Sequence, residues 1–268
     1  MAVTDWTWTW DESLYSGSAP HYQVGRMPYP PEMAAAIRDE LGLDGTGRLL
    51  DVGCGPGPLT RLLAPFFRAS VGVDADPGMI AEAARHPAPN TEWRQLRAED
   101  LPAGLGTFDL VTFAQSFHWM DQPLVAERVR PMINPGGAWV HIGATTHRGT
   151  GDDDPLWDRI NALVTRYLGP VRRAGAGTLP NGGRSGEDDV MRAAGYSGPT
   201  RLEVGGGQIV ERTADQIVSA VFSLSSSTPH LFGDRLAAFE ADLRRLLSET
   251  GDRFPQRTRA AGVSIWRP

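Results

Sequence analysis

The sequence is short of several residue types, and each shortage excludes a kind of site. Cys54 is the only cysteine in 268 residues, so the chain can form neither an internal disulfide nor a cysteine-rich metal centre, and we expect no bound metal. Lysine is absent, and the formal net charge is -6. Proteins that bind nucleic acid usually carry a basic face, so this charge argues against a nucleic-acid partner.

Long apolar runs are missing as well. No run reaches the roughly 18 residues that a membrane-spanning helix needs, so we expect no membrane partner. The first residues are acidic and rich in tryptophan, which is not the pattern of a secretory signal. With 41% hydrophobic and 22% charged residues, the composition is that of a globular protein, and we expect it in the cytoplasm.

Short apolar runs alternate with helical stretches in the first half of the chain. This alternation predicts a doubly wound α/β sheet with buried parallel strands. An early helix is expected to begin at the Pro30-Pro31 pair. The expected strands are residues 49–52, 69–73, 108–113 and 138–142, and the helices between them are residues 59–67, 77–85 and 122–133.

The second half predicts longer helices and two late strands. Helical periodicity is expected at residues 153–168, 188–194, 213–224 and 231–250. Strands are expected at residues 201–210 and 257–266, and a loop at 169–186.

The segment Asp51-Val52-Gly53-Cys54-Gly55-Pro56-Gly57 joins an apolar strand to a helix. Glycine at every second position lets the chain turn sharply and lets a ligand approach the backbone. Dinucleotide enzymes space their glycines differently, and a carboxylate such as Asp51 would repel a pyrophosphate. The same carboxylate suits ammonium and sulfonium charges, so the loop favours S-adenosylmethionine (SAM) over a nicotinamide dinucleotide.

A second acidic residue supports this interpretation. Asp74 ends the next apolar run, about 20 residues beyond the loop, where an acid can accept hydrogen bonds from both hydroxyls of a ribose. Met79 begins the following helix and could cover one face of an adenine. The alternative is that Asp74 only caps that helix ahead of Pro77.

Six segments in this order resemble motifs of the class I SAM-dependent methyltransferases. Residues 51–57 resemble motif I, and Val73-Asp74 resembles motif II. Residues 115–119 (QSFHW) are similar to a pattern of the methyltransferase type 11 group, which includes trans-aconitate methyltransferase-like proteins. The other similarities lie at residues 97–102, 108–111 and 134–137, so that the resemblance covers about residues 20–145.

The resemblance implies a Rossmann-like, seven-stranded α/β sheet. All strands but one would be parallel, helices would cover both faces, and a helical cap would be inserted between the last two strands. We therefore expect one structural domain in three parts. An aromatic lid would lie at residues 1–30, a SAM-binding core at 31–150, and the completion of the sheet at 151–268, with a substrate cap at about 211–256.

The resemblance also implies a cofactor site for SAM, with S-adenosylhomocysteine (SAH) as its product. Tyr22 and Arg26 fit a Tyr…Arg lead-in of the group and would reach the carboxylate of the methionine moiety. Met27 and Pro58 depart from the pattern of the group, and Pro58 removes one backbone donor. The residues expected to bind the cofactor are Tyr22, Arg26, Asp51, Gly53, Cys54, Gly55, Gly57, Asp74, Ala75, Met79, Arg97, Ala98, Glu99, Gln115, Ser116 and Trp119.

Methyl transfer from a sulfonium is an in-line displacement, so the protein mainly has to position the acceptor and exclude water. A base is needed only where the acceptor must lose a proton. His118 is the candidate base, or else a residue of the cofactor pocket. The tryptophans at positions 6, 8 and 10 would form an aromatic lid or an interface. The residues expected near the acceptor are Trp6, Trp8, Trp10, Tyr15, His118, Phe222 and Ser226.

Three functions remain open from the sequence. The first is a methyltransferase that acts on an O, N or C atom of a small molecule, in specialised metabolism. The second keeps the reaction but takes tRNA or a protein as the acceptor. The third is a SAM-binding protein without methyl transfer, either a regulator or a pericyclase-like enzyme. The oligomeric state is not indicated.

Overall fold

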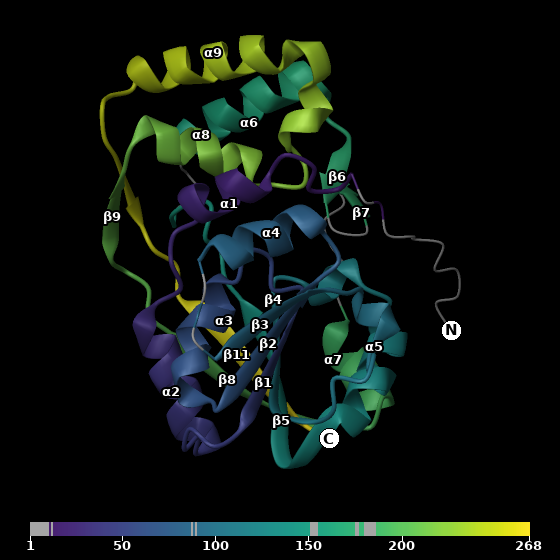
Figure 1. The fold of residues 1–268 in the computed structure, drawn as a ribbon. Coiled ribbons are helices and arrows are strands. Elements are labelled where there is room, and N and C mark those ends of the chain that lie inside the picture. Colours follow the sequence, from purple (N-terminus) through teal and green to yellow (C-terminus); the bar gives the residue numbers. More distant parts are fainter. Residues whose placement is uncertain are drawn as a thin grey trace.

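The computed structural model describes residues 11, 13–86, 88, 90–150, 155–174, 177–179 and 186–268, and of residues 155, 173, 174 and 177–179 only the backbone. Seven strands form one sheet in the order β3-β2-β1-β4-β5-β11-β8 (Figure 1). β11 is antiparallel to both of its neighbours, and the other strands are parallel to one another, which confirms the expected sheet. The strands are β1 (Arg48–Val52), β2 (Ala69–Asp74), β3 (Thr91–Gln95), β4 (Phe108–Ala114), β5 (Ile133–Gly143), β8 (Ser197–Val204) and β11 (Ala261–Arg267).

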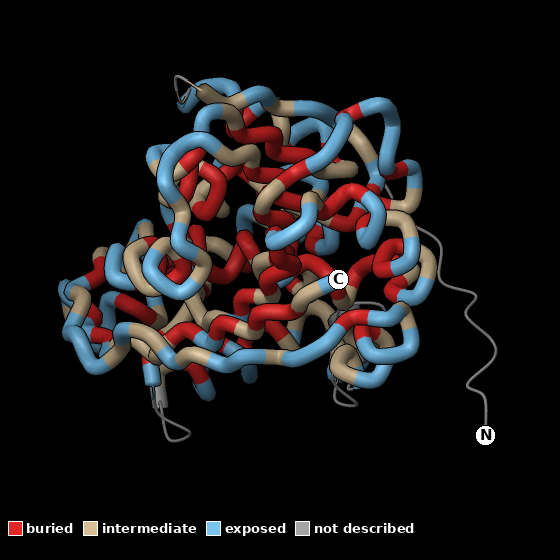
Figure 2. The backbone as a smooth tube through the Cα atoms, turned by 90° about the horizontal axis from the view of Figure 1, so that it is seen from below, coloured by how far each residue is buried: buried red, intermediate tan, exposed pale blue. Residues whose placement is uncertain are grey.

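Helices cover both faces of this sheet, because the central strands bury side chains on both sides. On one face, α2 (Pro31–Leu41) and α3 (Pro58–Leu63) pack on Leu49 of β1. On the other face, α5 (Gln122–Val129) and α7 (Glu187–Ala193) pack on Leu50 and on Trp139 of β5. Figure 2 shows the buried segments running through the middle of the molecule, with exposed segments outside them.

A helical layer lies beyond the carboxyl ends of the parallel strands (Figure 1). It contains α6 (Pro155–Leu168), α8 (Ala214–Phe222), the 3₁₀ segment Pro229–Arg235 and α9 (Leu236–Ser248). Its members share a core of their own, in which Phe232 stacks on Phe239 at 4.0 Å. The expected cap between the last two sheet strands is therefore present, and α6 joins it from an earlier part of the chain.

Two strands that do not belong to the seven-stranded sheet connect that sheet to the cap. β9 (Ile209–Arg212) runs up to the cap, and β10 (Phe254–Arg257) returns antiparallel to it. The sequence predicted one strand over residues 201–210. The structure instead ends β8 at Val204 and begins β9 at Ile209, since Gly205, Gly206 and Gly207 all take left-handed backbone conformations.

Four further elements were not expected. β3 lies at the edge of the sheet and is mostly polar, so it gave no apolar run. A hairpin of β6 (Arg172–Ala174) and β7 (Gly177–Leu179) lies within the predicted loop. The short helix α1 (Ala19–Gly25) lies in a segment for which no helix was expected.

α1 packs against the cap helix α8 (Figure 1). A Cβ added to Gly25 would lie 2.3 Å from the backbone nitrogen of Ala220, so the two helices touch at their backbones and only glycine fits there. The ring of His21 lies 5.0 Å from that of Phe222. The N-terminal segment thus belongs to the cap as much as to the sheet.

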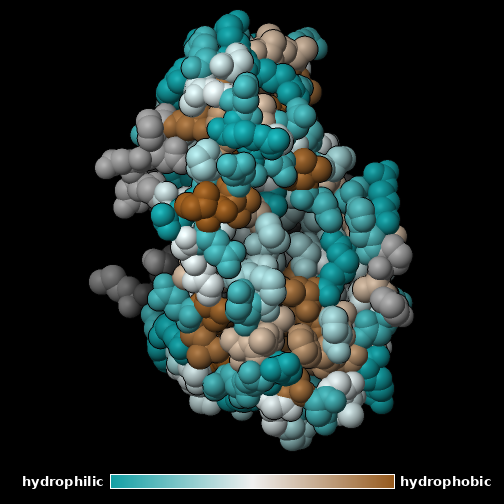
Figure 3. All heavy atoms as spheres, turned by 90° about the vertical axis from the view of Figure 1, so that its left-hand side faces the viewer, coloured by the Kyte–Doolittle hydropathy of each residue, from teal (hydrophilic) through white to brown (hydrophobic). Residues whose placement is uncertain are grey.

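The face shown in Figure 3 is largely hydrophilic, and its apolar residues form several small groups. Among the residues that the structure describes, no helix is both long and apolar enough to cross a membrane.

Candidate functional site

The glycine loop after β1 is held against the end of β2. The backbone N–H groups of Gly53 and Cys54 both donate to the carbonyl of Val73, at 2.8 and 3.0 Å. Gly53 has a φ of +67°, and a Cβ there would lie 2.4 Å from Cβ of Ser116. The loop is therefore wedged between the ends of β2 and β4, and this contact requires glycine.

Asp74 fixes the outer part of the same loop. Its Oδ2 accepts the backbone N–H of Gly55 at 2.8 Å, and its Oδ1 accepts that of Asp76 at 2.9 Å. Burial raises the pKa of this carboxyl to about 6. A carboxylate has about four lone-pair positions, so each oxygen can still accept one further hydrogen bond.

A strained turn follows β4, on the side of the glycine loop that faces away from β2. Ser116 Oγ donates to the carbonyl of Val52 at 2.7 Å, which fixes Ser116 beside Gly53. Gln115 then takes a φ of +55°, which is uncommon for a residue with a side chain. Strain of this kind persists where the surrounding structure imposes it, often at functional sites.

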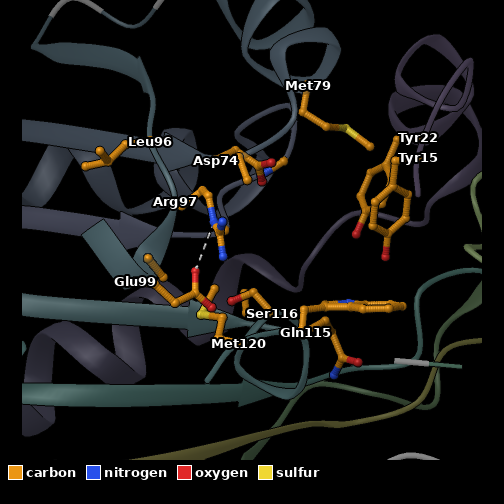
Figure 4. A pocket seen from close by; sticks show the side chains of 16 residues that line it. Tyr15, Tyr22, Asp74, Met79, Leu96, Arg97, Glu99, Gln115, Ser116 and Met120 are labelled. Carbon is orange, nitrogen blue, oxygen red and sulfur yellow. Dashed lines mark hydrogen bonds and ion pairs between the residues drawn. The ribbon is translucent and has the colours of Figure 1, made fainter. Parts of the chain in front are cut away.

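These segments surround an open cavity, whose empty space, counted out to its mouth, is about 670 Å³. In Figure 4, Asp74 and Arg97 point into it from one side, and the rings of Tyr15 and Tyr22 lie side by side at the other. Arg97 forms an ion pair with Glu99 at 3.6 Å. The ring of Tyr15 contacts that of Trp119 edge-on, at 5.7 Å between centroids.

The lining combines polar groups at a few points with apolar surface elsewhere. It consists of Tyr15, Tyr22, Gly53, Gly55, Asp74, Ala75, Met79, Leu96, Arg97, Ala98, Glu99, Ala114, Gln115, Ser116, Trp119 and Met120. Such a cavity can hold an elongated ligand that has hydroxyl groups at Asp74 and an apolar or aromatic part elsewhere.

Comparison with known proteins indicates the class of protein to which this fold and cavity correspond. Residues 49–137 match a family model described as a methyltransferase domain. An uncharacterised methyltransferase of Mycobacterium tuberculosis is 34% identical over 162 residues, which are 56% of this chain and 65% of that protein. A methyltransferase-like protein of Schizosaccharomyces pombe is 28% identical over 159 residues, which are 59% of this chain and 60% of that protein. The matches thus span less than two thirds of these relatives.

Solved structures agree in fold over nearly the whole chain. One is a protein of Anaeromyxobacter dehalogenans that is described as a type II methyltransferase. It has a TM-score of 0.53 at 22% identity, and the match covers 90% of this chain and 95% of that protein's chain. A DhpI-SAM-HEP complex has a TM-score of 0.52 at 20% identity, covering 96% and 95%. Residues 49–137 therefore form a methyltransferase-family domain, and the fold of the chain is that of the class I methyltransferases. The [4+2]-cyclase SpnF shares the fold as well, with a TM-score of 0.52 at 16% identity, covering 96% and 94%.

The cavity collects most of the residues that the sequence singled out. Of the expected cofactor ligands, twelve line it: Tyr22, Gly53, Gly55, Asp74, Ala75, Met79, Arg97, Ala98, Glu99, Gln115, Ser116 and Trp119. Tyr15, expected near the acceptor, lines it too. Sequence reasoning missed Leu96, Ala114 and Met120, whose only signal was their position next to predicted residues.

Asp51, expected to bind the cofactor, lies behind the cavity. Its side chain is 1% exposed and does not line the cavity. Its two oxygens accept the hydroxyls of Thr60 at 2.5 Å and Thr112 at 2.8 Å. Asp51 therefore joins α3 and β4 to β1 from inside the protein, and burial raises its pKa to about 6. It shapes the loop without touching the cavity.

Two other loop residues also lie behind the cavity. Cys54 is buried, and its thiol donates weakly to the carbonyl of Gly55. A Cβ on Gly57 would lie 2.2 Å from the ring of Trp93 in β3, so this glycine is required by packing. Neither residue lines the cavity, and the expected contact of both with the cofactor stays a prediction.

Arg26 stands next to the cavity and does not line it. Its guanidinium lies 4.6 Å from the ring centroid of Tyr22. Its Nε donates to Oγ of Ser223 at 2.8 Å, and its Nη2 to the carbonyl of Ser223 at 3.0 Å. Arg26 is therefore attached to the cap.

Of the described residues that were expected near the acceptor, Tyr15 alone lines the cavity. His118 does not line the cavity, and burial lowers its pKa to about 4. Phe222 is 2% exposed and packs in the core of the cap, since it ends a helix whose last six residues are all buried. Ser226 follows that helix and does not line the cavity either. Trp6, Trp8 and Trp10 lie outside the described residues.

The contact between Gly53 and Ser116 can be tested with two glycine variants. Gly42 has a similar φ of +62°, and a Cβ there would meet nothing within 4 Å. Gly42→Ala is expected to cost about 1 kcal/mol of backbone strain. Gly53→Ala should cost about 2 kcal/mol more, because its Cβ overlaps Ser116. Urea unfolding measures both values, and equal losses would show that the overlap is harmless.

Proposed function

We propose that the cavity binds SAM and that the chain transfers its methyl group to an O, N or C atom of a small-molecule acceptor, with SAH as the product. The observation that carries this proposal is the carboxylate of Asp74. It ends β2 at the cavity, is fixed by two backbone N–H groups, and keeps one free acceptor position on each oxygen. Two neighbouring ribose hydroxyls match that arrangement.

The backbone around Gly55 fits the same ligand. Gly55 lines the cavity, and a Cβ there would meet no protein atom within 4 Å, so the space beside this residue is open. A methionine chain could lie along it. Leu96, Ala98 and Met79 offer apolar surface for the adenine on the other side of Asp74, next to the pair Arg97 and Glu99.

Tyr22 and Arg26 would receive the methionine carboxylate. Each Nη atom of Arg26 makes one hydrogen bond within the protein, Nη2 to the carbonyl of Ser223 and Nη1 weakly to Thr146. One N–H on each Nη is thus left for a ligand carboxylate. A guanidinium suits this task because its donors match the two oxygens.

SAM supplies an activated methyl group when it is bound. The chain's own residues have to orient the acceptor and exclude water. Tyr15 and Trp119 form the aromatic end of the cavity, where a flat or apolar acceptor would pack. His118, the expected base, lies outside this wall. The site therefore suits acceptors that attack without losing a proton to the protein, such as a carboxylate or an amine.

The net charge of -6 and the absence of lysine favour a small molecule over tRNA as the acceptor. A role in specialised metabolism and a cytoplasmic location stay predictions. SAM binding without methyl transfer is the second candidate, because a cyclase shares this fold.

Turnover separates these candidates. Purified protein is incubated with SAM and panels of carboxylic acids, amines and phenols, and with bulk tRNA and denatured protein as controls, and SAH is quantified. We expect SAH with a member of the small-molecule panels and none above background with the macromolecules. SAH formed only with tRNA or protein would contradict the proposed acceptor, and tight SAM binding without SAH from any acceptor would favour the second candidate.

The role of Asp74 can be tested against its neighbour. Asp74→Ala should weaken SAH binding by about tenfold or more, the effect of losing hydrogen bonds to a charged group. Asp76→Ala is the matched control, since Asp76 caps α4 (Pro77–Arg85) through the N–H groups of Gly78 and Met79 and does not line the cavity. It should cost about 1 kcal/mol of stability and spare affinity. Calorimetry showing equal affinity losses would refute the assignment.

SAH binding should also depend on pH through Asp74. Its pKa is about 6, and only the ionised form can accept from both ribose hydroxyls. Affinity should be constant above pH 7 and fall below pH 6 by up to about tenfold per unit, because binding must then displace a proton. The amino and carboxyl groups of SAH titrate outside this range. The Asp74→Ala variant should bind SAH with an affinity that no longer depends on pH in this range. If the variant kept the pH profile of the unmodified protein, the titrating group would be a residue other than Asp74.

A further inference from the structure

Arg212, at the end of β9, is a buried cation. It is 2% exposed. Its Nη1 donates to the carbonyl of His147 at 2.8 Å and to Oε1 of Gln256 at 3.2 Å. Its Nη2 donates to the carbonyls of Gly25 at 2.5 Å and Gln216 at 2.7 Å. All four acceptors are neutral. Burial of a charge without a counter-charge is costly, so the position calls for an explanation.

The four acceptors belong to four separate segments. Gly25 ends α1, Gln216 lies in the first turn of α8, His147 follows β5, and Gln256 lies in β10. The guanidinium of Arg212 therefore connects the end of α1 to α8 of the cap, to the segment after β5 and to β10. The contact of Gly25 with the backbone of Ala220 makes this attachment tight.

α1 brings Tyr22 to the cavity and is followed directly by Arg26. Arg212 and Arg26 lie near each other, because Arg212 donates to the carbonyl of Gly25, the residue before Arg26. Burial, and then the charge of Arg26, lower the pKa of Arg212 to about 10. Arg26 donates to Ser223 and weakly to Thr146, which are neutral as well. Among the described residues, neither arginine forms an ion pair with a carboxylate. An anion bound at Arg26 would supply the counter-charge that both lack.

We propose that Arg212 is a positioning residue for the carboxylate end of the cofactor. It holds α1 so that Tyr22 and Arg26 face the methionine moiety, and its buried charge adds to the attraction for the carboxylate. The inference rests on the proposed function, because it requires SAM in the cavity. A purely structural Arg212 would stabilise the cap without distinguishing one part of the ligand from another.

Two ligands separate these roles. SAH carries the amino-acid part, whereas 5′-methylthioadenosine has the same adenosine and a thioether but no carboxylate. Arg212→Met is compared with Arg48→Met by calorimetry. Arg48 also donates to two backbone carbonyls, those of Thr107 at 2.9 Å and Leu105 at 3.1 Å, at the other end of the sheet. Its guanidinium also lies 4.5 Å from the ring centroid of Phe108, so Arg48→Met is a control for the loss of an arginine's local contacts far from the cavity.

Arg212→Met should weaken SAH binding by about tenfold, as for a lost contact with a charged group, and methylthioadenosine binding by less than about twofold. Arg48→Met should change neither. An equal loss for both ligands, or no loss for either, would overturn the proposal. If the unmodified protein bound neither ligand, the proposed function itself would fail. If it bound both with equal affinity, only the positioning role would fail.

Hydrogen exchange on the unmodified protein covers the case in which Arg212→Met does not fold. None of the residues of α8 lines the cavity, so direct contact cannot protect this helix. SAH should slow amide exchange in α8 through α1 and Arg212, and methylthioadenosine should not. Equal protection by both ligands, or by neither, would contradict the role of the carboxylate.

Discussion

The site depends on the hydrogen bonds that join the end of β2 to the turn after β1. The carbonyl of Val73 receives two backbone N–H groups of the turn, and the carboxylate of Asp74 receives a third from Gly55. These bonds hold the glycine loop open in left-handed conformations. They also fix the direction in which Asp74 faces the cavity. One short segment thus supplies both the backbone floor of the cavity and the carboxylate that we propose binds the ribose.

The cap has a different part in the site. The glycine loop, Asp74 and the strained turn at Gln115 all belong to the sheet and its two helical layers, without any contribution from the cap. The second wall comes from the segment of Tyr15 and Tyr22, which is packed on the cap through Gly25 and Arg26. A ligand in the cavity therefore contacts both parts of the molecule. If SAM binds there as we propose, its affinity and the placement of the cap are linked.

Much of this could be predicted from the sequence because the central strands are apolar on both faces. β1, β2 and β4 were found within one residue at each end, and α4 was predicted with its observed bounds. β3 was missed since an edge strand can be polar, and Trp93 is its only large apolar side chain. α1 was missed because it has seven residues and buries only Ala19 and Gly25.

The expected site residues that do not line the cavity share a physical cause. A sequence motif shows that a residue lies in or near the glycine loop. It does not show whether the side chain of that residue points into the cavity or into the protein core. Asp51 points inward because Thr60 and Thr112, from α3 and β4, offer hydroxyls there. Neither threonine is close to Asp51 in the sequence. His118 is placed by a 3₁₀ turn, Phe117–Trp119, that directs Trp119 to the cavity.

A crystal structure with SAH bound tests the central claim most directly. The account predicts both ribose hydroxyls within hydrogen-bond distance of the two oxygens of Asp74, with the bonds to Gly55 and Asp76 retained. The methionine carboxylate should lie at Tyr22 and Arg26, under the end of α1. A ribose turned away from Asp74, or SAH bound outside the cavity, would contradict it.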